Sequence, residues 1–250
     1  MRYVLEIAYK GTNYAGWQIQ SNAHTVQAEL VQALQILFRR KVSTLGAGRT
    51  DAGVHASQLF VHFDHEGALP KATVHSLNGI LPRDVAIKGL YRPTIDDFNT
   101  RFQAISRSYI YQIVQQKSPL HDDFSMWVRQ DLNIDLMNEA AALLSKYEDF
   151  ASFCKTHGDQ KTTLCRLDHA YWESLPDMLR FHIKANRFLR GMVRAIVGSL
   201  LWVGSEKISI ADFRAIIEAQ NRTKAGPNAE AKGLILSEVG YPDGMLERIH

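Results

Sequence analysis

The first hundred residues carry strand and helix patterns in an order that narrows the choice of fold. Apolar residues alternate over 2–10, as in a strand, and recur at helical spacing over 25–39, where Thr25 is a suitable N-cap. The other elements predicted here are strands at 41–47 and 57–64, a helix at 72–80 and a strand at 84–90. The resulting order, β-α-β-β-α-β, is that of ferredoxin-like α+β units.

The rest of the chain predicts a second unit of the same kind. A long strand begins near Gln103, and the elements predicted after it are a helix at 134–147, strands at 165–173 and 179–186, helices at 188–203 and 209–220, and a strand at 233–241. This is the first order again with one helix added. We therefore predict two similar α+β halves, an N-terminal domain over 1–104 and a C-terminal domain over 105–250.

The composition indicates a folded protein in a reducing compartment. Of the 250 residues 46% are hydrophobic, which is enough to bury a core. Charges at Arg2, Glu6 and Lys10 interrupt the N-terminal apolar pattern, so it does not resemble a signal peptide. With only two cysteines, Cys154 and Cys165, we expect reduced thiols and a cytoplasmic location. The net charge of +3 permits nucleic-acid binding without requiring it.

The stretch GAGRTDAGVH, residues 46–55, is the most unusual segment of the sequence. Its glycines suggest a phosphate-binding loop, but the dinucleotide fingerprint requires glycine at the position of Asp51. A P-loop requires Lys and then Ser or Thr where this chain has Val54 and His55. The binding of a nucleotide cofactor is therefore disfavoured.

Asp51 itself has two interpretations. An aspartate in a glycine-rich turn commonly accepts hydrogen bonds from nearby amides, which would make it structural. An aspartate is also ionised at neutral pH, so it can act as a nucleophile or base where an arginine offsets its desolvation. Arg49, two residues away, and Arg194 are the candidate arginines.

Two further segments combine basic and aromatic residues. In RFQAISRSYIYQI, the side chains of Arg101, Arg107, Tyr109 and Tyr111 would share one face of a strand, which suits either RNA stacking or ordinary cross-strand packing. In NRFLRGMVR, a helix would place Arg187, Arg190 and Arg194 on one side. These arginines form either a path for a phosphate backbone or a solvated helix face.

Four cysteine and histidine residues superficially resemble a zinc site. The residues Cys154, His157, Cys165 and His169 follow the pattern C-x-x-H and C-x-x-x-H. Pairing one cysteine with one histidine in each half is not the usual order for zinc, so we favour ordinary core or surface residues and predict no metal.

The motifs of this chain together resemble the TruA-type tRNA pseudouridine synthases nearly from end to end. The most specific block is RTDAGVHA, and the blocks in family order are YKGTNYAGWQIQ, TVQAEL, GAGRTDAGVHA, LNGILPRDV, RFQAISRSYIY, DFASF, FLRGMVRAIVG, AGPNAEAKGL and VGYP. The chain departs from the family pattern at Lys10, at Asn99 and Thr100, and at Glu230, and none of these positions touches the implied chemistry.

The resemblance implies an activity and roles for particular residues. It implies an isomerase that converts uridine to pseudouridine at positions 38–40 in the anticodon stem-loop of tRNA, without a cofactor. Asp51 would attack the target nucleotide, Tyr109 would stack on its base, Arg194 would pair with Asp51, and Arg49 would hold the nucleotide extruded. Of the other arginines, Arg107, Arg187 and Arg190 are candidates for RNA binding.

The same resemblance implies a fold and an assembly. The strands of the two halves would join in a central, mostly antiparallel sheet with helices packed on it, and the active cleft would lie between the halves. The family forms homodimers that hold the tRNA jointly. The alternative to this interpretation is a non-catalytic RNA-binding protein or RNA chaperone that uses the same groove without chemistry.

Overall fold

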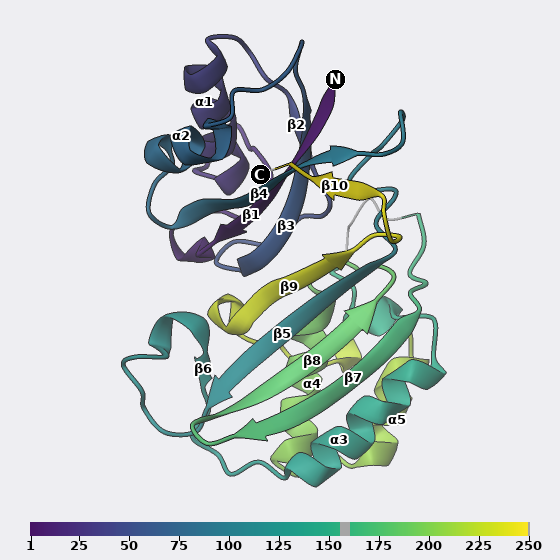
Figure 1. Cartoon of the computed structure of the whole chain (residues 1–250). Helices are drawn as coiled ribbons and strands as arrows, with labels where there is room; N and C mark the ends of the chain where they lie inside the picture. The colour runs from purple at the N-terminus through teal and green to yellow at the C-terminus, as the bar shows by residue number, and fades with distance from the viewer. Residues whose placement is uncertain (156–160, 250) are drawn as a thin grey trace. The chain divides into compact units, whose positions relative to one another are not determined.

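The structure is a computed structural model that describes residues 1–155 and 161–249, and it confirms the α+β class (Figure 1). The chain separates into two compact units, one formed by residues 1–105 with 236–250 and the other by residues 106–235. Residues 236–249 therefore pack with the N-terminal part of the chain. The domain limits predicted from the sequence stay a prediction.

The first unit is built on an antiparallel sheet. Along the chain, its first elements follow the predicted order β-α-β-β-α-β. Its elements are β1 (Arg2–Tyr9), α1 (Val26–Phe38), β2 (Thr44–Gly46), β3 (His55–Asp64), α2 (Thr73–Ile80), β4 (Val85–Pro93), β9 (Leu234–Gly240), which spans the limit between the units, and β10 (Leu246–Arg248). The strand order is β10-β4-β1-β3-β9, with β2 paired to β3.

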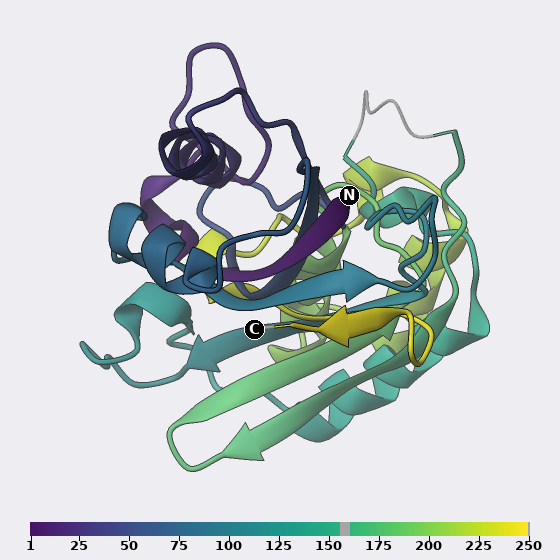
Figure 2. The ribbon, with the colours of Figure 1, turned by 45° about the horizontal axis from the view of Figure 1, so that its top comes forward.

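The helices of this unit begin where the sequence predicts. The Thr25 side chain accepts a hydrogen bond from the Ala28 amide and caps α1, and Leu30 and Leu34 on the apolar side of this helix are fully buried. This helix packs against α2, and α2 packs against β4. In the views of Figure 1 and Figure 2, both helices lie on one side of the sheet of this unit.

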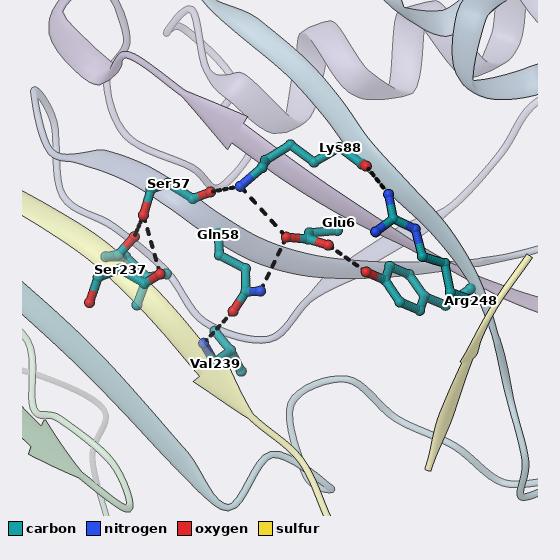
Figure 3. Close-up of polar contacts among 9 residues, drawn as sticks. Glu6, Ser57, Gln58, Lys88, Ser237, Val239 and Arg248 are labelled. Carbon is teal, nitrogen blue, oxygen red and sulfur yellow. Dashed lines mark hydrogen bonds and ion pairs between the residues drawn. The ribbon is translucent and has the colours of Figure 1, made fainter. Parts of the chain in front are cut away.

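A buried carboxylate links the strands of this unit (Figure 3). Glu6 on β1 accepts hydrogen bonds from the Tyr91 hydroxyl (2.6 Å) and the Gln58 amide (3.1 Å), and the Gln58 oxygen accepts one from the Val239 amide (3.0 Å). The ammonium of Lys88 lies 3.8 Å from the same carboxylate. Burial, with the neighbouring Glu6, raises the pKa of Tyr91 to about 12. The contacts supply the partners that a charge in this position requires, and they tie β9 to β1 through β3.

In the part that the structure describes, the second unit has a mostly antiparallel sheet and three α-helices. Its elements are β5 (Ser106–Val114), β6 (Met126–Trp127), α3 (Ile134–Leu143), β7 (Leu167–Leu175), β8 (Met178–Ala185), α4 (Met192–Gly204) and α5 (Ile210–Glu218). The strand order is β5-β8-β7, and β6 pairs in parallel with β5. Buried residues alternate along β8, and α3 packs against both β7 and α4 (Figure 1).

Two predicted elements begin later than expected. The helix predicted from residue 188 begins at Met192, because Gly191 adopts a left-handed conformation (φ 73°) and ends the preceding turn. The strand predicted from Gln103 begins at Ser106, because the Asn99 side chain accepts hydrogen bonds from the amides of Arg101 and Phe102 and holds a turn there. The prediction that Arg101 shares a strand face with Arg107 is therefore wrong.

No helix within residues 1–155 and 161–249 is both long enough and apolar enough to cross a membrane.

Candidate active site

The loop that carries Asp51 connects β2 to β3 and is fixed by the segment that follows β1. The carbonyl oxygen of Thr50 accepts a hydrogen bond from the Trp17 amide (3.2 Å), and the Gly53 amide donates to the carbonyl of Tyr14 (3.2 Å). The Thr50 side chain is buried against the Tyr9 hydroxyl, at 2.8 Å. The neighbours of Asp51 in sequence are thus held on both sides.

Close backbone approach explains the glycines of the supporting segment GTNYAGW. A Cβ atom on Gly16, which has a φ of 99°, would lie 2.5 Å from the Thr50 carbonyl oxygen, and one on Gly11 would lie 2.0 Å from that of Val54. The amide of Gly11 donates to Nδ1 of His55, which is 1% exposed. Any side chain at these two glycines would push the Asp51 loop away.

Sequence reasoning missed this support. The glycines of GTNYAGW indicate a turn, but a turn signal does not show which distant segment the turn contacts.

The two candidate residues of the loop are accessible to solvent to different degrees. Arg49 is exposed and Asp51 is half-buried, while the intervening Thr50 points into the protein. A Cβ atom at Gly48 would meet nothing within 4 Å, so the backbone just before Arg49 is open. The loop therefore offers a carboxylate and a guanidinium beside space that a large ligand can enter.

In the second unit, β5 brings two predicted residues close to the segment before α4. Arg107 donates through Nη1 to the carbonyl of Asn186 (2.9 Å). The ring of Tyr109 meets Phe188 edge-on, with centroids 5.1 Å apart and planes at 90°. Tyr109 is half-buried, so one part of its ring is packed and another is accessible. Such a supported ring can serve as a stacking surface for a base.

The three arginines near α4 do not share a helix face, and the prediction that they do is wrong. Arg194 lies in the first turn of α4, whereas Arg187 and Arg190 lie in the segment before it.

Arg187 is half-buried near both cysteine thiols. Burial raises the pKa of Cys165 to about 11, and the charge of Arg187 opposes that rise. Arg190 is exposed, and its carbonyl accepts a hydrogen bond from the Lys155 amide (3.0 Å).

The predicted residues thus gather in two groups, each within its own unit. Arg49 and Asp51 share one loop of the first unit. In the second unit, Arg107 and Tyr109 contact Asn186 and Phe188 of the segment that also carries Arg187 and Arg190, and Arg194 follows this segment on α4. The pairing of Arg194 with Asp51 stays a prediction.

The described residues considered for zinc do not form a metal site, although the thiols of Cys154 and Cys165 lie near one another. Both cysteines are buried thiols that are not joined in a disulfide, and His169 is exposed on β7. His157 lies outside the described residues. Among residues 1–155 and 161–249 no group of three or more His, Cys, Asp or Glu side chains is arranged to hold a metal ion.

Comparisons with known proteins show the family of this chain. The family model described as tRNA pseudouridine synthase matches residues 140–242. The tRNA pseudouridine synthase A of Azobacteroides pseudotrichonymphae is 46% identical over 243 residues, covering 97% of each chain. The chain belongs to this family. The enzyme of the same name from Bacteroides thetaiotaomicron is 46% identical over 97% of this chain and 91% of its own, and that of Chromobacterium violaceum is 42% identical over 97% and 94%.

Membership in the tRNA pseudouridine synthase A family confirms the resemblance predicted from the sequence motifs, and it makes the chain an isomerase. It favours the enzymatic interpretation over a non-catalytic RNA-binding protein. A solved H/ACA ribonucleoprotein bound to a substrate RNA also matches, with a TM-score of 0.34 and 11% identity over 80% of this chain and 44% of its own, a likeness too low to support an argument.

Proposed function

We propose that this chain isomerises uridine to pseudouridine at positions 38–40 in the anticodon stem-loop of tRNA, with Asp51 as the attacking carboxylate. The observation that carries the proposal is the match over 97% of the chain to relatives named tRNA pseudouridine synthase A. The loop, which is held by hydrogen bonds at Thr50 and Gly53 and presents Asp51 half-buried near the exposed Arg49, fits the proposed attack.

The proposed reaction rearranges bonds within one nucleotide. Attack by Asp51 allows the bond between C1′ and N1 to break, and the detached base rotates while it stays in the site. A bond then forms between C1′ and C5, the bond that the attack formed between the Asp51 carboxylate and the nucleotide breaks to free the carboxylate, C5 loses its hydrogen to water as a proton, and N1 gains a proton. Substrate and product are isomers, so the proposal includes neither an oxidant nor a cofactor.

The other residues of the site bind and orient the nucleotide. A uridine in a stacked stem is shielded, so it must be flipped out before Asp51 can reach it. Tyr109 stacks on the flipped base, Arg49 holds the nucleotide extruded, and Arg194 pairs with the carboxylate of Asp51 and keeps it ionised. The RNA backbone is contacted by Arg107, Arg187 and Arg190.

The proposal extends to assembly and location. The enzyme is a homodimer that holds one tRNA with both copies. It works in the cytoplasm, as two buried cysteines kept as thiols would suggest.

Release of tritium from uridine C5 tests the activity directly. We expect the protein to release tritium from an unmodified tRNA transcript labelled at C5 of uridine, and to release none when uridines 38–40 are replaced by cytidines. Binding of the transcript without release would instead indicate a non-catalytic RNA-binding protein.

A further inference from the structure

The segment 225–230, which belongs to the AGPNAEAKGL motif, forms a two-way contact with the first turn of α4. The Ala229 amide donates to the carbonyl oxygen of Arg194 (3.0 Å), and Nε of Arg194 donates to the carbonyl oxygen of Ala229 (2.7 Å). One residue of the segment thus fixes both the backbone and the side chain of Arg194. The orientation of a guanidinium is determined once its Nε is committed to a fixed acceptor.

Glycines allow the segment to lie directly on α4. A Cβ atom on Gly198 would lie 1.8 Å from the carbonyl oxygen of Pro227, and one on Gly226 would lie 2.7 Å from the carbonyl carbon of Gly198. Contacts this short leave no room for any side chain at either glycine. The distance between α4 and the segment is therefore set by two residues without side chains.

A buried hydroxyl group holds the same contact. The Oγ atom of Ser199 accepts a hydrogen bond from the Gly226 amide (2.8 Å) and donates to the carbonyl of Ala195 one turn earlier (2.9 Å), and its side chain is fully buried. Without this hydroxyl the buried Gly226 amide would lose its acceptor, and an unsatisfied buried amide is unfavourable.

Two further side chains hold the segment from other directions. Arg222 donates to the Gly226 carbonyl (3.0 Å) and to the side chain of Asn228 (3.0 Å). Tyr111, buried on β5 two residues from Tyr109, donates to the Glu230 carbonyl (2.8 Å). Together with the bonds to Arg194 and Ser199, these bonds fix the segment 225–230 to α4, to β5 and to the side chain of Arg222.

The rest of the Arg194 side chain is available for a ligand. Among residues 1–155 and 161–249, the bond from Nε to Ala229 is the one hydrogen bond of this side chain, and both terminal nitrogens are without an acceptor. Arg194 is half-buried, so these nitrogens can bind an anion from solvent or from a neighbouring carboxylate.

We propose that the segment 225–230 is a brace that positions Arg194, and that Gly198, Ser199 and Gly226 are positioning residues for the reaction. This inference rests on the proposed function, in which Arg194 pairs with the attacking carboxylate. The brace holds Nε so that the terminal nitrogens point in one direction before the substrate arrives, which lowers the cost of orienting the charge in the transition state. Positioning of this kind affects kcat more than KM.

The variant Ser199→Ala removes one contact of the brace, and Ser205→Ala is its matched control. Ser205 also donates to the carbonyl one turn earlier on α4 (2.8 Å to Leu201), but it does not contact the segment 225–230. In the tritium-release assay we expect Ser199→Ala to lower kcat about tenfold with KM within about twofold, and Ser205→Ala to leave both unchanged. Gly198→Ala should lower kcat about a hundredfold if it folds.

A double-mutant cycle separates positioning from general destabilisation. If Ser199 acts through Arg194, adding Ser199→Ala to Arg194→Ala should lower kcat less than about twofold further. An equal loss from Ser199→Ala in both backgrounds, or no loss in the wild-type background, would overturn the inference.

A readout without turnover keeps this test distinct from that of the proposed function. In protein labelled with ¹⁵N-arginine, the Nε–H of Arg194 should exchange slowly with solvent in the wild type and in Ser205→Ala, and rapidly in Ser199→Ala. Rapid exchange in the wild type would disprove the brace even if the enzyme were active. Absence of tritium release with slow exchange would disprove the proposed function alone.

Discussion

Acidification should destabilise this protein through one buried histidine. His62 on β3 is 8% exposed, and its Nδ1 lies 3.0 Å from the Thr100 hydroxyl and accepts a hydrogen bond from the Thr100 amide (3.3 Å). Burial, reinforced by the positive charge of Arg2 and opposed by Asp64, lowers the pKa of His62 from 6.5 to about 4. Protonation of Nδ1 would also leave the Thr100 amide without its acceptor.

The size and the sign of the effect follow from the two pKa values. The unfolded chain protonates His62 near pH 6.5 and the folded chain only near pH 4, so between these values the unfolded state binds more protons. The contribution of the neutral His62 to the free energy of unfolding is fully present above pH 6.5, its pKa in the unfolded chain. It is lost as the pH falls toward about 4, its pKa in the folded chain. The loss amounts to about 2 kcal/mol between about pH 8 and about pH 5, and about 3 kcal/mol once the pH is well below 4.

Urea unfolding at several pH values measures this loss. Because carboxylates titrate in the same range, the informative quantity is the difference between the wild type and His62→Gln. We expect the variant to be less stable at neutral pH, and to lose about 2 kcal/mol less than the wild type on acidification to about pH 5. The control His75→Gln changes an exposed histidine on α2 and should retain the wild-type slope. Equal slopes for the wild type and His62→Gln would refute the reasoning.

Three other predictions concern a helix cap, the stacking ring and the RNA path. Thr25→Ala removes the cap of α1 and should lower the free energy of unfolding by about 1 kcal/mol, whereas Thr25→Ser should restore most of it. Tyr109→Phe should keep kcat/KM within about threefold, and Tyr109→Ala should lower it about tenfold to a hundredfold; an equal loss in both would argue against stacking. In filter binding, Arg190→Gln should reduce the slope of log K against log salt concentration by about one, and an unchanged slope would exclude a phosphate contact.

Most helices and strands could be predicted from the sequence because their signals are local. The position of α1 followed from an apolar repeat and a capping threonine that lie within one segment. The start of α4 could not be predicted in this way, because Phe188 and Leu189 extend the apolar repeat to the wrong side of Gly191. Periodicity does not show that Gly191 adopts a left-handed conformation there.

The residues of the candidate site could likewise be predicted only where their signals are local in the sequence. The loop with Arg49 and Asp51 could be singled out because its residue types are unusual, and the nucleotide-cofactor motifs could be excluded by counting. Its support by Gly11 and Gly16, and the contact of Ala229 with Arg194, join residues about 35 to 45 positions apart. The short strand β10, which pairs with β4, was missed for the same reason. One sequence shows no pairing between distant segments, so such contacts appear only in the structure.

The variant Asp51→Asn is the most direct test of the proposed chemistry. It keeps the size of the side chain and removes the attacking oxygen anion. We predict that it binds the tRNA transcript within about threefold of wild-type affinity and releases tritium from C5 at least about a thousandfold more slowly. The control Asp96→Asn, at an exposed carboxylate of the same unit, should release tritium at the wild-type rate. Release by Asp51→Asn at a rate near that of the wild type would contradict the role of Asp51 as the attacking carboxylate.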